Sequence, residues 1–177
     1  MNRYAGILVI VVLLAFVGIV VINKSSKSSD KVTSTSTEKQ METSQKDESM
    51  MKDKYKGKVL AGKSSPFIEF NSEDYEKAKQ EGKIIVLDFY ANWCPICRAE
   101  APELHAGFND LTHDKVVGFR VNYNDSDTDE DEKKLAKEFG ITYQHTKVVL
   151  KDSEVVLKTQ DAWDKQTFLA ELDVITE

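Results

Sequence analysis

The sequence predicts an α/β domain in which helices cover both faces of a central mixed sheet. Apolar runs of strand length alternate with segments of helical periodicity from residue 66 to the C-terminus. One run, residues 84–90 (IIVLDFY), is almost continuously apolar, which is typical of a strand buried on both faces. About 120 residues follow Gly57, enough chain to bury a core of this kind.

The elements are expected in the following order. Residues 66–70 alternate apolar and polar side chains, as an edge strand does. A helix follows, capped by Asn71 or Ser72 and ended by Gly82. After the buried strand 84–90, the remaining elements are a helix to about Leu111, a strand over 116–123, a helix over 131–139, a strand pair at 147–151 and 154–159, and a last helix capped by Asp164.

The motif Cys94-Pro95-Ile96-Cys97 stands where the buried strand gives way to a helix. Unpaired N–H groups and the positive end of the helix dipole stabilise a thiolate at Cys94, and Pro95 suits the first helical turn. Cys97 lies nearly one turn on, close enough to form a disulfide. Cys94 is expected to be the nucleophile, because it lies where solvent and the helix N-terminus meet, whereas Cys97 lies further inside. The pattern predicts a redox-active dithiol.

A zinc half-site and two unrelated core cysteines are the alternatives. Structural zinc needs about four ligands, and the sequence has no second CxxC pair and no His-x-His cluster. The chain has no other cysteine, so no structural disulfide framework is expected. We therefore expect no metal, and no cofactor besides the redox-active disulfide itself.

Around this motif the sequence resembles the thioredoxin family. Asp88 stands six residues before Cys94, where the family has a buried carboxylate. Trp93 directly precedes Cys94, and Tyr90 fills an upstream aromatic position. These two aromatics either shield the dithiol and offer substrate a flat apolar surface, or simply pack. The resemblance runs from Pro66 to the C-terminus, about three-fifths of the chain, and implies a thioredoxin-like fold.

The resemblance also implies roles. Cys94 attacks a substrate disulfide, Cys97 resolves the mixed disulfide, and Asp88 accepts a proton beneath Cys97. A strand-end carboxylate facing solvent is the alternative for Asp88. Arg120 occupies a strand position where the family often carries a lysine near that carboxylate, so it either pairs with Asp88 or is a surface arginine. Pro102 falls five residues after Cys97, at the family's kink in the active-site helix.

One position departs from the family pattern. Thioredoxin-like proteins usually carry a cis-proline in the loop facing the CxxC motif, and His145 stands there in this chain. A cis bond before histidine would cost about 3–4 kcal/mol, so the Gln144–His145 peptide is expected to be trans. The imidazole would lower the pKa of Cys94 if protonated, and relay a proton or join a metal site if neutral. The alternative is a loop histidine turned into solvent. Proline at position 145 is expected to restore a more ordinary loop.

An acidic loop over residues 125–132 (DSDTDEDE) partly matches a calcium-binding loop. Asp127, Asp129 and Asp131 match the first, third and fifth ligand positions of such a loop, but Glu132 stands at the sixth position, where the loop requires glycine. The loop is therefore expected to be a solvated segment that caps the next helix.

The first third of the chain differs in composition from the rest. Residues 4–22 carry no charge, and a helix of that length would span about 28 Å, close to the thickness of a bilayer core. An uncleaved membrane anchor is expected over residues 1–23, because the apolar region of a signal peptide is shorter. Residues 24–56 are rich in Ser, Thr, Lys and Glu, which is typical of a disordered spacer. The thioredoxin-like domain is expected over residues 57–177.

Two observations oppose each other on orientation. Lys24, Lys27 and Lys31 follow the apolar run and only Arg3 precedes it, which slightly favours a cytoplasmic domain. The anchor, however, begins almost at residue 1, like an export signal, and a cytosolic thioredoxin needs no tether. We therefore expect a single-pass protein of the cell membrane whose catalytic domain is extracytoplasmic.

The sequence predicts a membrane-tethered thiol–disulfide oxidoreductase that reduces protein disulfides. A formal net charge of −6 argues against nucleic acid as a partner. Similar tethered proteins receive electrons through a polytopic membrane thiol carrier, which is the partner expected here. The Pro95-Ile96 dipeptide departs from the Gly-Pro pair of reducing thioredoxins, so a thiol oxidase is one alternative. A non-catalytic metal-binding or chaperone module built on Cys94, Cys97 and His145 is another.

Overall fold

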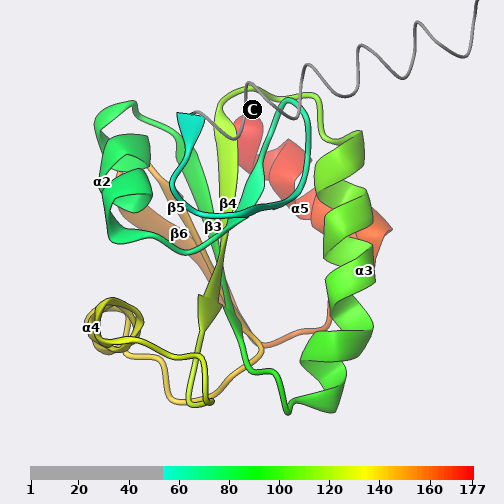
Figure 1. Cartoon of the computed structure of the whole chain (residues 1–177). Coiled ribbons are helices and arrows are strands. Elements are labelled where there is room, and N and C mark those ends of the chain that lie inside the picture. The colour runs from blue at the N-terminus through cyan, green and yellow to red at the C-terminus, as the bar shows by residue number, and fades with distance from the viewer. Residues whose placement is uncertain (1–53) are drawn as a thin grey trace, which may run out of the picture. The chain divides into compact units, whose positions relative to one another are not determined.

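The computed structural model describes residues 54–177, which are drawn in colour in Figure 1. The predicted anchor and nearly all of the predicted spacer lie outside these residues. In the part of the chain that the structure describes, no helix combines the length and the apolar character needed to cross a bilayer.

A six-stranded mixed sheet forms the centre of the domain, with the strand order β1-β2-β4-β3-β5-β6. Both β2 and β3 run parallel to β4, whereas the β1–β2, β3–β5 and β5–β6 pairs are antiparallel. The strand bounds are β1 Val59–Ala61, β2 Phe67–Glu69, β3 Ile84–Tyr90, β4 Val116–Asn122, β5 Thr146–Lys151 and β6 Glu154–Thr159. The central position of β3, between β4 and β5, accounts for its apolar sequence, because both of its faces are covered.

Helices cover both faces of this sheet, two on each side (Figure 1). The four helices are α2 Ser72–Gln80, α3 Pro95–Asp110, α4 Glu130–Glu138 and α5 Lys165–Thr176. On one face, Tyr75 of α2 and Leu135 of α4 share a core cluster with β3 and β4 side chains. On the other face, Phe108 of α3 and Phe168 of α5 form a second cluster. The predicted α/β fold with a mixed sheet and helices on both faces is confirmed.

One predicted strand position is wrong. The strand at residues 66–70 was expected at an edge of the sheet, but β1 pairs with it, Val59 lying opposite Ile68. The edge strands of the sheet are therefore β1 and β6. The unpredicted strand β1 has the sequence Val59-Leu60-Ala61, which is apolar throughout and so lacks the alternation by which short strands are recognised.

The predicted helix caps form as expected. Asn71 accepts the N–H groups of Glu73 and Asp74 at the start of α2. Asp129 and Glu132 form a reciprocal capping box at the start of α4, so the acidic loop does cap the next helix. Asp164 accepts the N–H of Thr167 at the start of α5.

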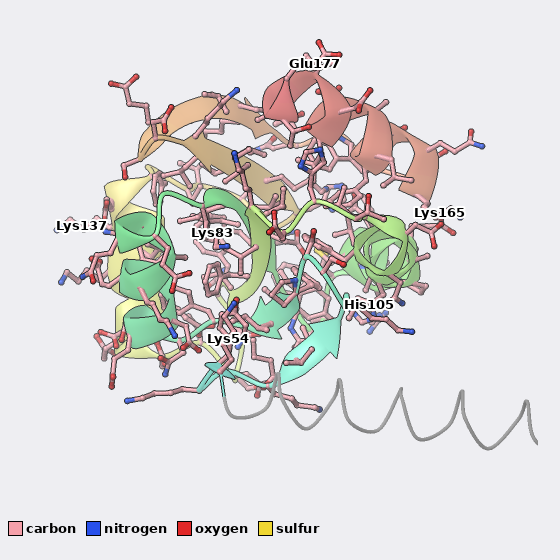
Figure 2. All side chains as sticks on the ribbon, turned by 90° about the horizontal axis from the view of Figure 1, so that it is seen from above. Lys54, Lys83, His105, Lys137, Lys165 and Glu177 are labelled. Atoms are coloured by element: carbon pink, nitrogen blue, oxygen red, sulfur yellow. A yellow bond between two sulfur atoms is a disulfide. The ribbon has the colours of Figure 1, made fainter. Side chains whose placement is uncertain are left out.

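The helices α3 and α5 pack closely against each other. A Cβ added at Gly107 of α3 would lie 2.3 Å from Cδ1 of Phe168, so only glycine allows this approach. In Figure 2, Lys165 at the start of α5 lies beside α3, and its Nζ is 2.8 Å from Oδ2 of Asp110. Packing against α5 thus fixes the position of α3, the helix that carries the CxxC motif.

Candidate active site

Cys94 and Cys97 form a disulfide at the junction of β3 and α3, with their Cα atoms 5.3 Å apart. Cys94 is the N-cap residue of α3, and Pro95 occupies the first turn, as the sequence predicts. The Sγ of Cys94 accepts a hydrogen bond from the N–H of Cys97 at 3.2 Å. The helix N-terminus therefore directs one of its free donors at the sulfur of Cys94, where a thiolate would be stabilised.

Exposure does not distinguish the two cysteines. Cys94 is 3% exposed and Cys97 is 4% exposed, so the expected position of Cys94 against solvent is wrong. Both cysteines belong to one small buried cluster with Ala91, against which Tyr90 packs. The asymmetry between the two residues lies instead in the hydrogen bond, which the helix donates to Cys94 alone.

The turn that precedes Cys94 is held by the acidic loop. The indole N–H of Trp93 donates to the carbonyl of Asn124 at 3.0 Å, and the backbone N–H of Asn92 donates to Oδ2 of Asp125 at 2.8 Å. The ring of Trp93 is nevertheless half exposed. The sequence predicts only helix capping for this loop and does not indicate these contacts, because they join segments about 30 residues apart.

Asp88 is buried on β3, so its alternative position facing solvent is excluded. In the sheet register it lies between Arg120 of β4 and Lys147 of β5. Burial raises the pKa of Asp88 to about 7. The positive charges of Lys147 and Arg120 act to lower this pKa, and the negative charge of Glu100 acts to raise it. A carboxylate with a pKa near neutrality can both take up and release a proton at physiological pH.

Arg120 neither pairs with Asp88 nor lies free on the surface, the two positions expected for it; its ion pair is with Glu69. It is half-buried, and its Nη2 lies 2.9 Å from Oε1 of Glu69, with which it is paired in register across β2 and β4. Its guanidinium carbon also lies 5.2 Å from the ring centroid of Tyr90. Tyr90, half-buried, packs against the small cluster that contains both cysteines. Arg120 therefore acts on Asp88 through its charge, and its ion pair is with Glu69.

His145 is buried, which excludes the alternative of a solvent-facing loop histidine. No cis peptide bond occurs among residues 54–177, so the Gln144–His145 peptide is trans, as predicted. His145 has a left-handed backbone (φ 64°), and its N–H donates to the carbonyl of Phe89 at 2.6 Å. Proline, which was expected to restore a more ordinary loop, does not fit this conformation, because it requires φ near −65° and has no N–H to donate.

The imidazole of His145 faces a carboxylate. Its Nδ1 lies 2.9 Å from Oε2 of Glu100, although the angle is not that of a hydrogen bond. Burial, and then the charge of Lys147, lowers the pKa of His145, while Glu100 acts in the opposite direction. The ring is therefore neutral at neutral pH.

Glu100 and Lys147 are two site residues that sequence analysis misses. Both are buried, and Nζ of Lys147 lies 2.6 Å from Oε1 and 2.7 Å from Oε2 of Glu100. Two patterns could have indicated them. Glu100 lies three residues after Cys97, on the same face of the helix. Lys147 interrupts the start of a buried strand, where a charged residue needs a partner.

In the region from Lys54 to the C-terminus, no three His, Cys, Asp or Glu side chains come together as a metal site. Cys94 and Cys97, two residues of the metal-binding alternative, are joined in a disulfide in this structure.

Comparisons with known proteins agree with the fold and the motif. The sequence model of the thioredoxin family matches residues 66–174. Thioredoxin H4 of Arabidopsis thaliana is 43% identical over 86 residues, which cover 47% of this chain and 64% of the relative. A thioredoxin H-type of Fagopyrum esculentum is 33% identical over 85 residues, which cover 48% of this chain and 66% of the relative. The match thus spans about two thirds of the length of these relatives.

A solved structure is similar in fold and, more distantly, in sequence. It is the structure of thioredoxin f2 in complex with ferredoxin:thioredoxin reductase, with a TM-score of 0.50 and 25% sequence identity. The alignment covers 63% of this chain and 96% of the other. The family match over most of the described domain, together with the CxxC motif at the start of α3, shows that this chain belongs to the thioredoxin family.

Proposed function

We propose that this protein is a thiol–disulfide oxidoreductase that reduces disulfides of proteins outside the cytoplasmic membrane, to which its N-terminal segment tethers it. The observation that carries the proposal is the Cys94–Cys97 disulfide at the start of α3, in which the helix donates a hydrogen bond to the Sγ of Cys94. That donor would stabilise the thiolate that attacks a substrate.

The reaction begins from the reduced dithiol. The Cys94 thiolate attacks one sulfur of the substrate disulfide, forms a mixed disulfide and releases the other substrate sulfur as a thiolate. Asp88 takes the proton of Cys97, and the Cys97 thiolate then attacks the sulfur of Cys94. The second substrate thiolate leaves and the Cys94–Cys97 disulfide forms. Two electrons pass from the protein to the substrate.

An apolar surface beside the motif supports a protein substrate. Trp93, Ile96 and Tyr143 are 49%, 55% and 63% exposed. Trp93 and Ile96 flank Cys94, and Tyr143 lies in the loop whose His145 bonds the end of β3. Exposed aromatic and aliphatic side chains of this kind favour contact with another protein chain.

The oxidised protein needs a dithiol donor to become active again. The similar thioredoxin f2 is seen in a complex with ferredoxin:thioredoxin reductase. For a domain tethered outside the membrane we propose a different donor, a dithiol presented by a polytopic membrane thiol carrier. The predicted anchor would keep the domain close to such a carrier.

Trapping of the mixed disulfide tests the assigned roles. Cys97→Ser should accumulate mixed disulfides with substrate proteins through Cys94, because the resolving thiol is missing. Cys94→Ser should accumulate none, and this matched variant is the control. Equal trapping by the two variants, measured on non-reducing gels, would reject the roles given to the two cysteines.

Thiol oxidation is the competing direction of the same chemistry, and it is favoured by the proline directly after Cys94. The reduction potential of the Cys94–Cys97 pair separates the two directions. A value near that of thioredoxin, about −270 mV, agrees with a reductant, whereas a value near −120 mV would assign the protein as an oxidant. Insulin-disulfide turnover by the full chain would separate both from a non-catalytic chaperone module.

A further inference from the structure

A buried ion pair joins α3, the helix that carries Cys97, to β5. The side chains of Glu100 and Lys147 have exposed fractions of 4% and 0%. Besides Glu100, Nζ of Lys147 donates to the carbonyl of Asp161 at 3.0 Å, and Oε1 of Glu100 accepts the N–H of Trp163. A buried pair that keeps its charges must satisfy them with such bonds, and it contributes little to stability compared with apolar side chains of the same size. Stability alone therefore does not account for the Glu100–Lys147 pair.

The pair spans the two groups on which the resolving step depends. Lys147 lies directly across from Asp88 in the β3–β5 register. Glu100 lies on α3 three residues after Cys97, on the same buried face of the helix. Glu100 and Lys147 thus connect the helix that carries Cys97 to the strand next to Asp88.

The charges that face Asp88 come from three neighbouring elements. They are Lys147 of β5, Arg120 of β4 and Glu100 of α3, and His145 in turn lies 2.9 Å from Glu100. Arg120 is engaged by Glu69, and His145 is neutral at neutral pH. Among these neighbours, Lys147 acts most strongly in favour of the Asp88 carboxylate.

We propose that Glu100 and Lys147 are positioning residues of the dithiol reaction that act on Asp88 through opposite charges. The ammonium of Lys147 stabilises the carboxylate that receives the proton of Cys97, and the carboxylate of Glu100, which is bonded to that ammonium, weakens this stabilisation. The proposal rests on the proposed function for the role of Asp88. In this arrangement the proton moves from the Cys97 thiol to Asp88, and Lys147 and Glu100 take no part in the transfer itself.

The test uses charge changes of opposite sign in the full-length oxidised protein. Lys147→Met removes the cation, so the pH midpoint of Asp88, followed by carboxyl-carbon NMR, should rise by roughly one unit. Glu100→Gln removes an anion and should lower this midpoint. The pH midpoint of mixed-disulfide release should move in the same direction as that of Asp88. A role in packing alone would not produce opposite shifts.

A double variant protects the test against unfolding, because a single change leaves a buried charge without its partner. Glu100→Leu combined with Lys147→Met replaces the pair by apolar side chains, and its Asp88 midpoint should lie between those of wild type and Lys147→Met. If either single variant does not fold, the double variant decides, and an unchanged midpoint would overturn the proposal. Lys165→Met, which breaks an exposed ion pair with Asp110, is the control and should leave Asp88 unchanged.

The two proposals fail in different ways. Opposite shifts of the Asp88 midpoint, with parallel shifts in mixed-disulfide release, support the positioning role. Shifts of equal sign, or none, in folded variants overturn it, whatever the activity of the wild type. Absence of insulin-disulfide turnover in the wild type would overturn the proposed function, and with it the catalytic meaning of the pair.

Discussion

At the scale of single residues, Asp88 links the stability of the domain to pH. Burial raises its pKa from 3.8 to about 7 in the folded protein, while the same carboxyl group in the unfolded chain titrates near its ordinary value. Between these two values the folded protein holds a proton that the unfolded chain releases. The contribution of Asp88 to stability is therefore fully present below its unfolded pKa of 3.8 and falls as the pH rises, until it is lost once the pH has passed the folded pKa of about 7.

Asp88→Asn should remove this pH dependence. At pH 8 the variant should be more stable than wild type by up to about 4 kcal/mol, because it no longer ionises a buried group. Near pH 4 the two proteins should be equally stable. Urea denaturation of the oxidised proteins at both pH values measures the difference. Asp110→Asn, an exposed change, is the control, and an Asp88→Asn effect of the same size at both pH values would contradict the argument.

His145 is held in a left-handed conformation that proline cannot adopt. His145→Pro should therefore destabilise the domain by about 3 kcal/mol or more, since the N–H bond to Phe89 is lost as well. His145→Gly keeps the N–H and suits a positive φ, so it is the matched control for the backbone. Thermal or urea denaturation compares the two variants. If His145→Pro were as stable as His145→Gly, the loop would have to adopt another conformation than the one described.

At the scale of elements, the close packing of α3 on α5 depends on Gly107. Gly107→Ala gains up to about 1 kcal/mol in helix propensity, but its Cβ would meet the ring of Phe168. Overpacking of this kind costs about 1–3 kcal/mol, so the variant should be less stable than wild type. Ala106→Gly is a matched control on the same helix, because it loses propensity without a clash. A net gain in stability for Gly107→Ala, measured by urea denaturation, would show that α5 moves aside freely.

For the whole molecule, the proposed anchor and spacer would determine on which side of the membrane the chemistry takes place. Protease added to intact cells or spheroplasts should cut within residues 24–56 and release the thioredoxin domain, because an exposed polar segment without packing signals is cut readily. A cytoplasmic protein cut only after lysis serves as the control. Protection of the chain until lysis would place the domain in the cytoplasm and exclude the proposed substrates.

The sequence alone determined the fold class, the order of the helices and strands from residue 66 onward, their caps and the place of the dithiol. These features depend on short-range patterns: apolar periodicity, the capping residues Asn71, Asp129 and Asp164, and the strand–turn–helix context of Cys94. Local chemistry is enough for them, because each is decided within one or two turns of chain.

Which charged side chains form pairs depends on the tertiary structure and could not be predicted from the sequence. Arg120 pairs with Glu69 rather than Asp88, because β2 brings a carboxylate into register with it. Glu100 and Lys147 are 47 positions apart in the sequence and meet only because α3 packs over the start of β5. The equal burial of the two cysteines likewise depends on surrounding segments. Contacts between distant segments depend on which strands and helices become neighbours in the fold, which no single segment of sequence encodes.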